Sequence, residues 1–215
     1  MFRRLLSPAH PSFSDIFVAT LGEKCTYIAP QYLERKNYAS VEAYMAALGY
    51  EPLPSDSAVP GAQQQFEGEE QYFERMVGYV SLYAAYAEAA SGVAGHPHGL
   101  ERAWTWLARL SNQRPRTATA AVLHAFLAVG AYSLQGRYPA QTRKLLEVIN
   151  ADLLLRMDSS TPPRKAAQAV LALWLQTTLH QLQQYGRFEE PKGRNMPQAQ
   201  ESDSSRQEIH HDDQY

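Results

Sequence analysis

The chain has 215 residues, of which 45% are hydrophobic and 20% charged, a balance typical of a folded globular domain. Its formal net charge of −2 and pI near 6.4 argue against direct binding to nucleic acid, so a phosphate site would have to be a local cluster of basic residues. No apolar run approaches the roughly 18 residues of a membrane span. The single cysteine, Cys25, excludes an internal disulfide and fits a reducing nuclear or cytosolic compartment.

Two short helices are predicted near the N-terminus. Ser12 or Ser14 can cap the first, in which apolar residues recur at helical spacing. Ser40 precedes a run of helix formers over 41–48 and Gly49 follows it, which is the expected order of an N-cap and a C-terminal glycine.

Five long amphipathic segments follow a loop over residues 51–68 that is rich in proline, glycine and glutamine. In each segment apolar residues recur at intervals of three and four, which predicts helices with one buried face. In the second, the expected buried stripe includes Trp104 and Leu107. These helices are expected to begin at Glu69, Leu100, Thr117, Pro139 and Pro162, with Thr161 capping the last one and Gly186 ending it after Tyr185.

The order of these segments predicts an all-α fold. No run alternates between apolar and polar residues over the length of a strand, and the loops between the long segments are short. Antiparallel pairs of such helices bury their faces by packing on the next pair, as in a bundle or solenoid-like stack. After Met196 almost nothing is apolar, so we expect a disordered polar tail.

Few residues look chemically reactive. His96 and His98 flank Pro97 and could form a metal pair or a base, but without a third ligand they fit better a structured helix entry in which the imidazoles bond free backbone groups. Cys25 could be a nucleophile, although a free cysteine is more often a buried small hydrophobe. No phosphate-binding glycine motif or nucleophile elbow is present, so we expect no enzymatic activity and no metal site.

Two small basic groups are candidates for binding an anion. Lys24, Arg35 and Lys36 lie on either side of a proline break, and Arg143 with Lys144 lies in the fourth long segment. Cationic side chains near free helix ends attract phosphate, whereas an ordinary solvated face would have the same composition. Both interpretations stay open for both groups.

The string HPHGLERAWTWLARLSN over residues 96–112 resembles the HPHGL…W.WLA..LN segment of the C-terminal domain of the GLE-one family of nuclear-pore mRNA export mediators. Other pieces resemble the family in the same order along the chain. They are Lys24-Cys25-Thr26-Tyr27, residues 44–50, Arg75-Met76, residues 82–85, Thr117-Ala118-Thr119, Phe126-Leu127, residues 138–141, Lys144-Leu145-Leu146 and Pro191-Lys192-Gly193. The resemblance covers residues 12–194 and implies an N-terminal extension over 1–11, a helical domain, and the tail over 195–215.

The resemblance implies a HEAT-like stack of antiparallel helix pairs, similar to the middle domain of translation initiation scaffolds. It also implies a function at the cytoplasmic face of the nuclear pore complex and in the cytoplasm. Family members bind the DEAD-box RNA helicase of mRNA export and stimulate its ATPase cycle, in fungi with inositol hexakisphosphate. Further implied partners are an FG-nucleoporin and translation initiation and termination factors.

The resemblance also implies a site for inositol hexakisphosphate, and Lys24 is the basic residue that both the resemblance and the basic clusters select. We expect Lys24, Arg35 and Lys36 to form this site, with Arg143 and Lys144 as the runner-up. This chain has Glu23 where the family often has a second lysine. Two other functions remain open: a structural helical scaffold without regulatory output, and a hydrolase that uses Cys25 and His96.

Overall fold

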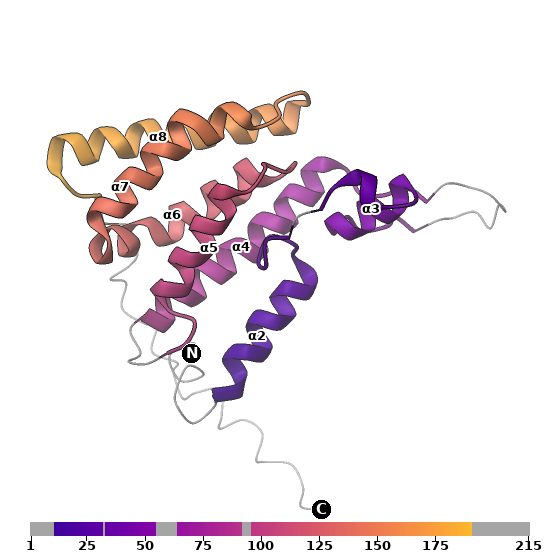
Figure 1. Cartoon of the computed structure of the whole chain (residues 1–215), viewed down its shortest axis with the longest axis horizontal. Coiled ribbons are helices and arrows are strands. Elements are labelled where there is room, and N and C mark those ends of the chain that lie inside the picture. The colour runs from indigo at the N-terminus through magenta and orange to yellow at the C-terminus, as the bar shows by residue number, and fades with distance from the viewer. Residues whose placement is uncertain (1–10, 32, 55–63, 92–95, 191–215) are drawn as a thin grey trace, which may run out of the picture.

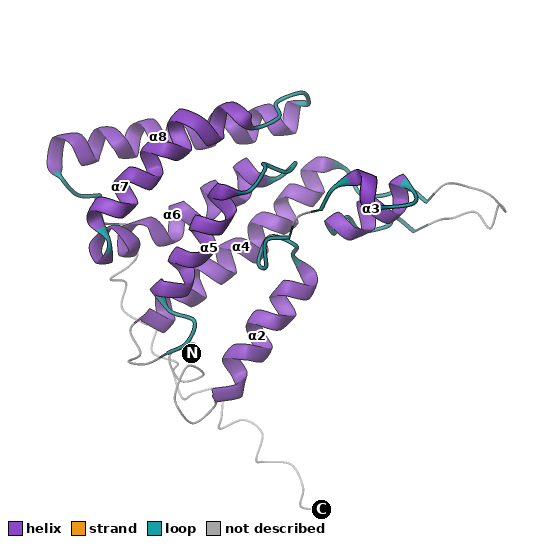
Figure 2. Ribbon diagram, viewed as in Figure 1, coloured by secondary structure: helices purple, strands orange, loops and turns teal. Residues whose placement is uncertain are grey.

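The computed structural model describes residues 11–31, 33–54, 64–91 and 96–190, and the extension and the tail expected from the sequence lie almost wholly outside these ranges. Within them the fold is all-α (Figures 1 and 2). The α-helices are α2 (Pro11–Lys24), α3 (Val41–Leu48), α4 (Glu69–Ser91), α5 (Leu100–Asn112), α6 (Thr119–Arg137), α7 (Pro139–Val148) and α8 (Pro162–Tyr185). Extended pairing in the described residues is limited to one bridge, Pro52 to Phe66.

Local signals place several helix ends where the sequence predicts them. The Ser40 side chain accepts a hydrogen bond from the backbone N–H of Ala43 at the start of α3. Gly49 has φ +90° and ends α3, and Gly186 has φ +69° and ends α8. A side chain at either glycine would be strained, because L-residues rarely adopt positive φ.

Other helix starts differ from the prediction. α2 begins at Pro11, so Ser14 lies inside the helix and is buried rather than capping it. α6 begins at Thr119, two residues later than expected. Thr161 does stand at the N-cap of α8, but its hydroxyl donates to the Glu69 carboxylate at 2.6 Å and makes no cap hydrogen bond. At Thr161 a contact with the distant helix α4 has replaced a local one.

The long helices form two layers. α4, α6 and α8 run in the same direction: Ser133, late in α6, bonds Glu88, late in α4, and Gln135 of α6 reaches Gly186 at the end of α8. α5 returns antiparallel to α4 and packs against α4 and α6, while α7 packs against α6 and α8. Figure 1 shows the resulting stack of antiparallel helix pairs, which confirms the expected fold class.

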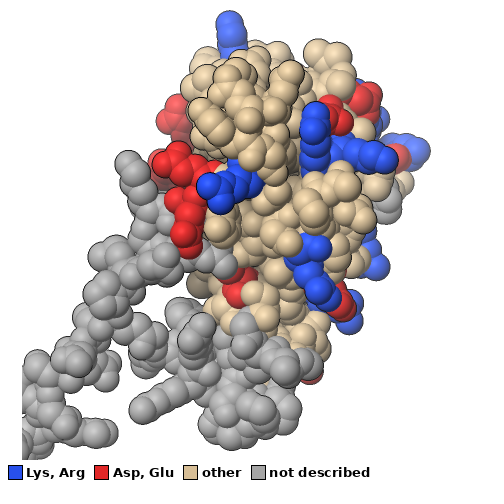
Figure 3. Space-filling model, turned by 90° about the vertical axis from the view of Figure 1, so that its left-hand side faces the viewer, with Lys and Arg blue, Asp and Glu red and all other residues tan. Residues whose placement is uncertain are grey.

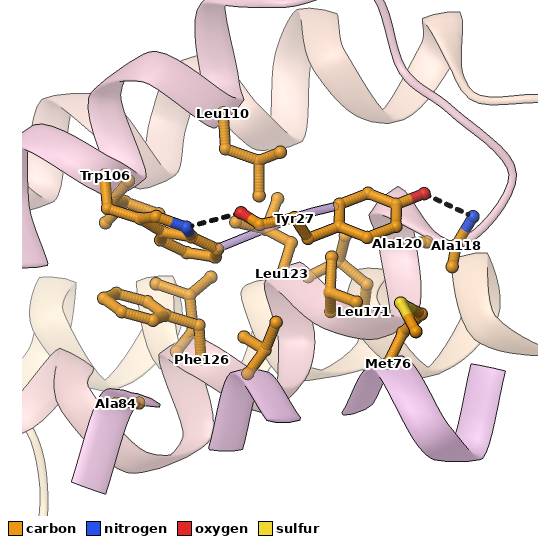
Figure 4. Packing of buried hydrophobic residues seen from close by; sticks show 14 of the residues in the cluster. Tyr27, Met76, Ala84, Trp106, Leu110, Ala118, Ala120, Leu123, Phe126 and Leu171 are labelled. Atoms are coloured by element: carbon orange, nitrogen blue, oxygen red, sulfur yellow. Dashed lines mark hydrogen bonds between the residues drawn. The ribbon is translucent and has the colours of Figure 1, made fainter. Parts of the chain in front are cut away.

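The core runs between these layers. Figure 4 shows Trp106 of α5 packed over Phe126 of α6, with 4.2 Å between ring centroids. The prediction for α5 was partly wrong: Trp104 is only half-buried, against Tyr138, while Trp106 is 3% exposed. Leu107 is fully buried as expected. Each fully buried large side chain contributes roughly 1.5 to 3 kcal/mol to the free energy of unfolding, so this core supplies much of the stability of the fold.

Candidate functional site

The turn after α2 carries Lys24, the first basic residue that the sequence selects. Lys24 is the last residue of α2 and is exposed, while the next residue, Cys25, is completely buried. The Cys25 N–H still donates to the Leu21 carbonyl, so the helical bonding continues for one residue and then turns. Because the exposed Lys24 is followed directly by the buried Cys25, the point at which the Lys24 side chain projects into solvent is fixed.

Arg116 holds this turn from a distant part of the chain. Its guanidinium donates to the Thr26 hydroxyl at 3.1 Å and to the Thr26 carbonyl at 3.0 Å. The same guanidinium lies over the Tyr27 ring, 4.0 Å from the centroid, in a cation–π contact. An arginine can make both contacts at once because its fork of donors and its stacking face are separate.

Four further hydrogen bonds tie the turn and its neighbours together. The indole N–H of Trp106 donates to the Tyr27 carbonyl at 2.7 Å, and the Ala118 N–H donates to the Tyr27 hydroxyl at 3.0 Å, as Figure 4 shows. The Thr26 hydroxyl and the Tyr72 hydroxyl both donate to the Leu48 carbonyl. Burial raises the pKa of Tyr27, so its hydroxyl stays protonated in this network. The turn is therefore a rigid junction of α2, α3, α4, α5 and α6.

The second and third predicted residues, Arg35 and Lys36, form the 3₁₀ turn η1 (Arg35–Asn37) and are both exposed. Arg35 donates to the Tyr38 carbonyl at 2.7 Å, and Lys36 pairs with Glu34 at 2.6 Å. The hydrogen bond that Lys36 donates to Glu34 and the positive charge of Lys36 lower the pKa of the Glu34 carboxyl. Among the described residues no hydrogen bond or ion pair joins Lys24 to η1.

Two arginines that the sequence analysis did not select lie beside these elements. Arg116 contacts Thr26 directly, and the positive charge of Arg114 lowers the pKa of Glu34, next to η1. The loop between α5 and α6 thus adds cations to a region that the sequence assigned to Lys24, Arg35 and Lys36. The available signal was the pair of arginines around Pro115, directly after the family-like string over residues 96–112.

The runner-up residues lie elsewhere in the fold. Arg143 and Lys144 are exposed on α7, which packs against α6 and α8 rather than α2. Arg143 pairs with Glu147 one turn later at 3.0 Å. Figure 3 shows basic and acidic side chains interspersed over one face of the molecule, with neutral surface between them. The two predicted basic groups are therefore separate and cannot hold one small anion together.

The His96-Pro97-His98 segment joins the start of α5 to α2. His96 Nε2 lies 3.0 Å from the Ser14 hydroxyl, and its Nδ1 accepts from the His98 N–H at 3.2 Å. His98 Nε2 lies 2.7 Å from an Asp15 carboxylate oxygen. Burial, followed by the nearby His98, lowers the pKa of His96. The imidazoles therefore act as hydrogen-bonding partners of α2 and of the helix entry.

The geometry offers little for the hydrolase hypothesis. Burial raises the pKa of the completely buried Cys25 thiol, which is the opposite of what a nucleophilic cysteine needs. Among the described residues, the hydrogen bonds of His96 go to Ser14 and His98, and none goes to Cys25. Within the described residues, no group of three histidine, cysteine or acidic side chains could hold a metal ion. No helix among them is long and apolar enough to cross a membrane.

The described residues form a stack of antiparallel helices joined at the turn after α2, and comparison with known proteins identifies the family. Residues 2–150 match the model of the GLE1-like protein family. The chain belongs to that family.

Curated relatives share this assignment. The chain is 34% identical over 157 residues to mRNA export factor GLE1 of Rattus norvegicus, covering 71% of this chain and 21% of the relative. It is 32% identical over 152 residues to the Danio rerio protein of the same name, covering 68% of this chain and 21% of that relative. The Arabidopsis thaliana protein of the same name is 26% identical over 191 residues, covering 86% of this chain and 26% of that relative. The chain thus spans about a fifth to a quarter of the length of these relatives.

Solved structures support the same fold. A chain in the structure of the S. cerevisiae Dbp5 C-terminal domain bound to Gle1 and IP6 superposes with a TM-score of 0.58 at 22% identity, covering 80% of this chain and 55% of that chain. A second structure, with a Gle1 variant, gives a TM-score of 0.59. At this level of identity the superposition establishes the shared helical fold.

Proposed function

We propose that this chain is the helicase-binding part of an mRNA export factor, which binds a DEAD-box RNA helicase and stimulates its ATPase cycle. Membership of the GLE1-like family supports this proposal, as do the relatives named mRNA export factor. The fold is shared with structures that contain Dbp5, Gle1 and IP6. Such a factor works by binding, because it holds two lobes of the helicase in an orientation that favours product release. It needs no catalytic groups of its own.

Inositol hexakisphosphate is the proposed small-molecule ligand, with Lys24, Arg35 and Lys36 as its site. Lys24 ends α2, where the free carbonyls of a helix C-terminus repel an anion. A polyanion there depends on cationic side chains from several elements, and Arg114 and Arg116 supply additional ones. Since Lys36 already pairs with Glu34, the ligand competes with that carboxylate. We therefore expect weak binding that falls steeply with salt. Arg143 and Lys144 are the alternative site.

We place the protein at the nuclear pore complex, on its cytoplasmic face, and in the cytoplasm. An FG-nucleoporin and translation initiation and termination factors are the further proposed partners. These proposals rest on family membership, because the chain spans only part of each relative.

The family match carries the helicase proposal, and the turn that presents exposed Lys24 beside the loop with Arg114 and Arg116 supports the proposed ligand site. The test is ATP hydrolysis by the purified helicase of mRNA export with single-stranded RNA, in the presence of this chain and with or without inositol hexakisphosphate. We expect stimulation by the chain and further stimulation by the ligand. Lys24→Gln should remove the ligand-dependent part, whereas Lys165→Gln, an exposed lysine on α8, should leave it intact.

Each other outcome has a defined meaning. Helicase binding in a pull-down without a change in ATP hydrolysis would replace the activator by the structural scaffold. Absence of binding would overturn the helicase proposal altogether. If Lys24→Gln has no effect and Arg143→Gln with Lys144→Gln removes the ligand response, the ligand site is on α7.

A further inference from the structure

The layer formed by α4, α6 and α8 has a groove along its outer surface that no described element covers. The volume of the groove is about 370 Å³. Its walls come from α4 and α8, and its floor comes from α6, the helix that lies between them (Figure 1). The lining residues are Val77, Ser81, Ala121, His124, Ala125, Ala128, Val129, Ala167 and Val170.

The groove is hollow because three of the five side chains that α6 contributes to its floor are alanines, beside His124 and Val129. Ala121, Ala125 and Ala128 recur at intervals of four and three, so they form one stripe along α6. The facing walls carry Val77 on α4 and Val170 on α8, of which Val170 is 50% exposed. Alanines that leave such a channel between larger side chains provide room for side chains of another molecule. Helical stacks commonly bind partners along a surface of this shape.

We propose that this groove binds a basic amphipathic helix of a partner protein. An extended peptide would place unpaired backbone N–H and C=O groups against the alanine floor, where Ser81 and His124 are the polar side chains of the lining. A helix satisfies its backbone internally, so only its apolar ridge enters the groove. Burial lowers the pKa of His124, which keeps this imidazole neutral and the floor uncharged.

The charge of the partner helix follows from the rim of the groove. Glu70 and Glu74 lie seven and three residues before Val77, on the same face of α4, and both are exposed. Neither forms a salt bridge within the described residues. On α8 the matching face carries the uncharged residues Pro163, Ala167 and Val170, and the cation beside them on that face, Arg164, is already paired with Glu69 and Asp158. A partner helix with Lys or Arg on the flank toward α4 therefore complements the rim.

The experiment measures binding of labelled helical peptides to the whole chain by fluorescence anisotropy, without helicase or inositol phosphate. The basic probe has leucines at intervals of three and four and lysines on one flank. The acidic probe replaces these lysines by glutamates, and a third probe has the basic composition with a central proline pair that breaks the helix. We expect the basic helix to bind at least about tenfold more tightly than either comparison probe.

Variants of the chain then locate the binding. Ala128→Trp fills the floor at an exposed position and should weaken the basic probe about tenfold or more. Glu70→Lys with Glu74→Lys should weaken it several-fold at low salt and less at high salt. Glu101→Lys, an exposed site on α5 outside this groove, is the matched control and should change nothing. Circular dichroism and thermal unfolding verify that each variant is folded.

Three results would overturn the inference. They are equal affinity for the basic and acidic helices, tighter binding of the proline-broken probe, and affinity for the basic probe that survives Ala128→Trp in a folded protein. Because no helicase is present, none of them bears on the proposed function.

Discussion

The Arg116 guanidinium lies 4.0 Å from the centre of the Tyr27 ring and at the same time donates two hydrogen bonds to Thr26. A lysine can supply the charge but not the stacking face or the fork of donors. We expect Arg116→Lys to lower the free energy of unfolding by about 1 to 2 kcal/mol and Arg116→Ala by about 2 to 3 kcal/mol. Urea unfolding measures both. Arg109→Lys, exposed on α5, should stay within about 0.5 kcal/mol of the parent.

Trp106 should contribute more to stability than Trp104, although the sequence favoured the latter. Trp106 is 3% exposed and donates to the Tyr27 carbonyl, whereas Trp104 is half-buried against Tyr138. We expect Trp106→Ala to cost about 3 to 5 kcal/mol and Trp104→Ala about 1 to 2 kcal/mol. If Trp106→Ala does not fold, Trp106→Phe, which keeps a ring but loses the N–H, provides the comparison. Equal costs for the two tryptophans would contradict the assignment of the buried face.

The thiol of Cys25 should be unreactive in the folded chain. It is completely buried, and burial raises its pKa, so little thiolate is present at neutral pH. Since it is the single cysteine of the chain, labelling by a disulfide reagent reports on this site alone. We expect slow labelling in buffer and rapid labelling in denaturing urea. Labelling as fast in buffer as in urea would instead revive a reactive role for Cys25.

Stability should decrease as the pH falls through about 6.5, the ordinary pKa of histidine. Burial lowers the pKa of His96 and of His124 in the folded chain. The unfolded chain therefore binds protons at a higher pH than the folded chain, and lowering the pH favours unfolding. The urea midpoint, measured between about pH 7.5 and 5.5, should fall with pH.

Substitutions test whether these two histidines cause the effect. His96→Gln combined with His124→Gln should flatten the pH dependence of the urea midpoint, because the variant has lost both histidines whose pKa is lowered in the folded chain. His180→Gln, exposed on α8, should leave the slope as it is in the parent. A double variant with an undiminished slope would assign the effect to other groups.

The basic site shows how far sequence reasoning extends. Lys24 was selected because it lies in a family-like motif, and it is exposed as a ligand-binding side chain must be. Arg114 and Arg116 were not selected, because they lie far along the chain from Lys24, and the pair of arginines around Pro115 does not by itself indicate which turn it meets. The assignment of Lys24, Arg35 and Lys36 to inositol hexakisphosphate stays a prediction.

The amino-acid sequence by itself determined the helices, most of their ends and the family of this protein. Those properties are local or collinear: helical periodicity, the Ser40 cap, the glycines at 49 and 186, and a string of motifs in a fixed order. Only the tertiary structure decided which face of α5 is buried. The apolar residues of that helix fit two rotations, one with Trp104 inward and one with Trp106 inward. The choice depends on whether an indole N–H can reach the Tyr27 carbonyl and a ring can reach Phe126, and both partners come from other segments of the chain.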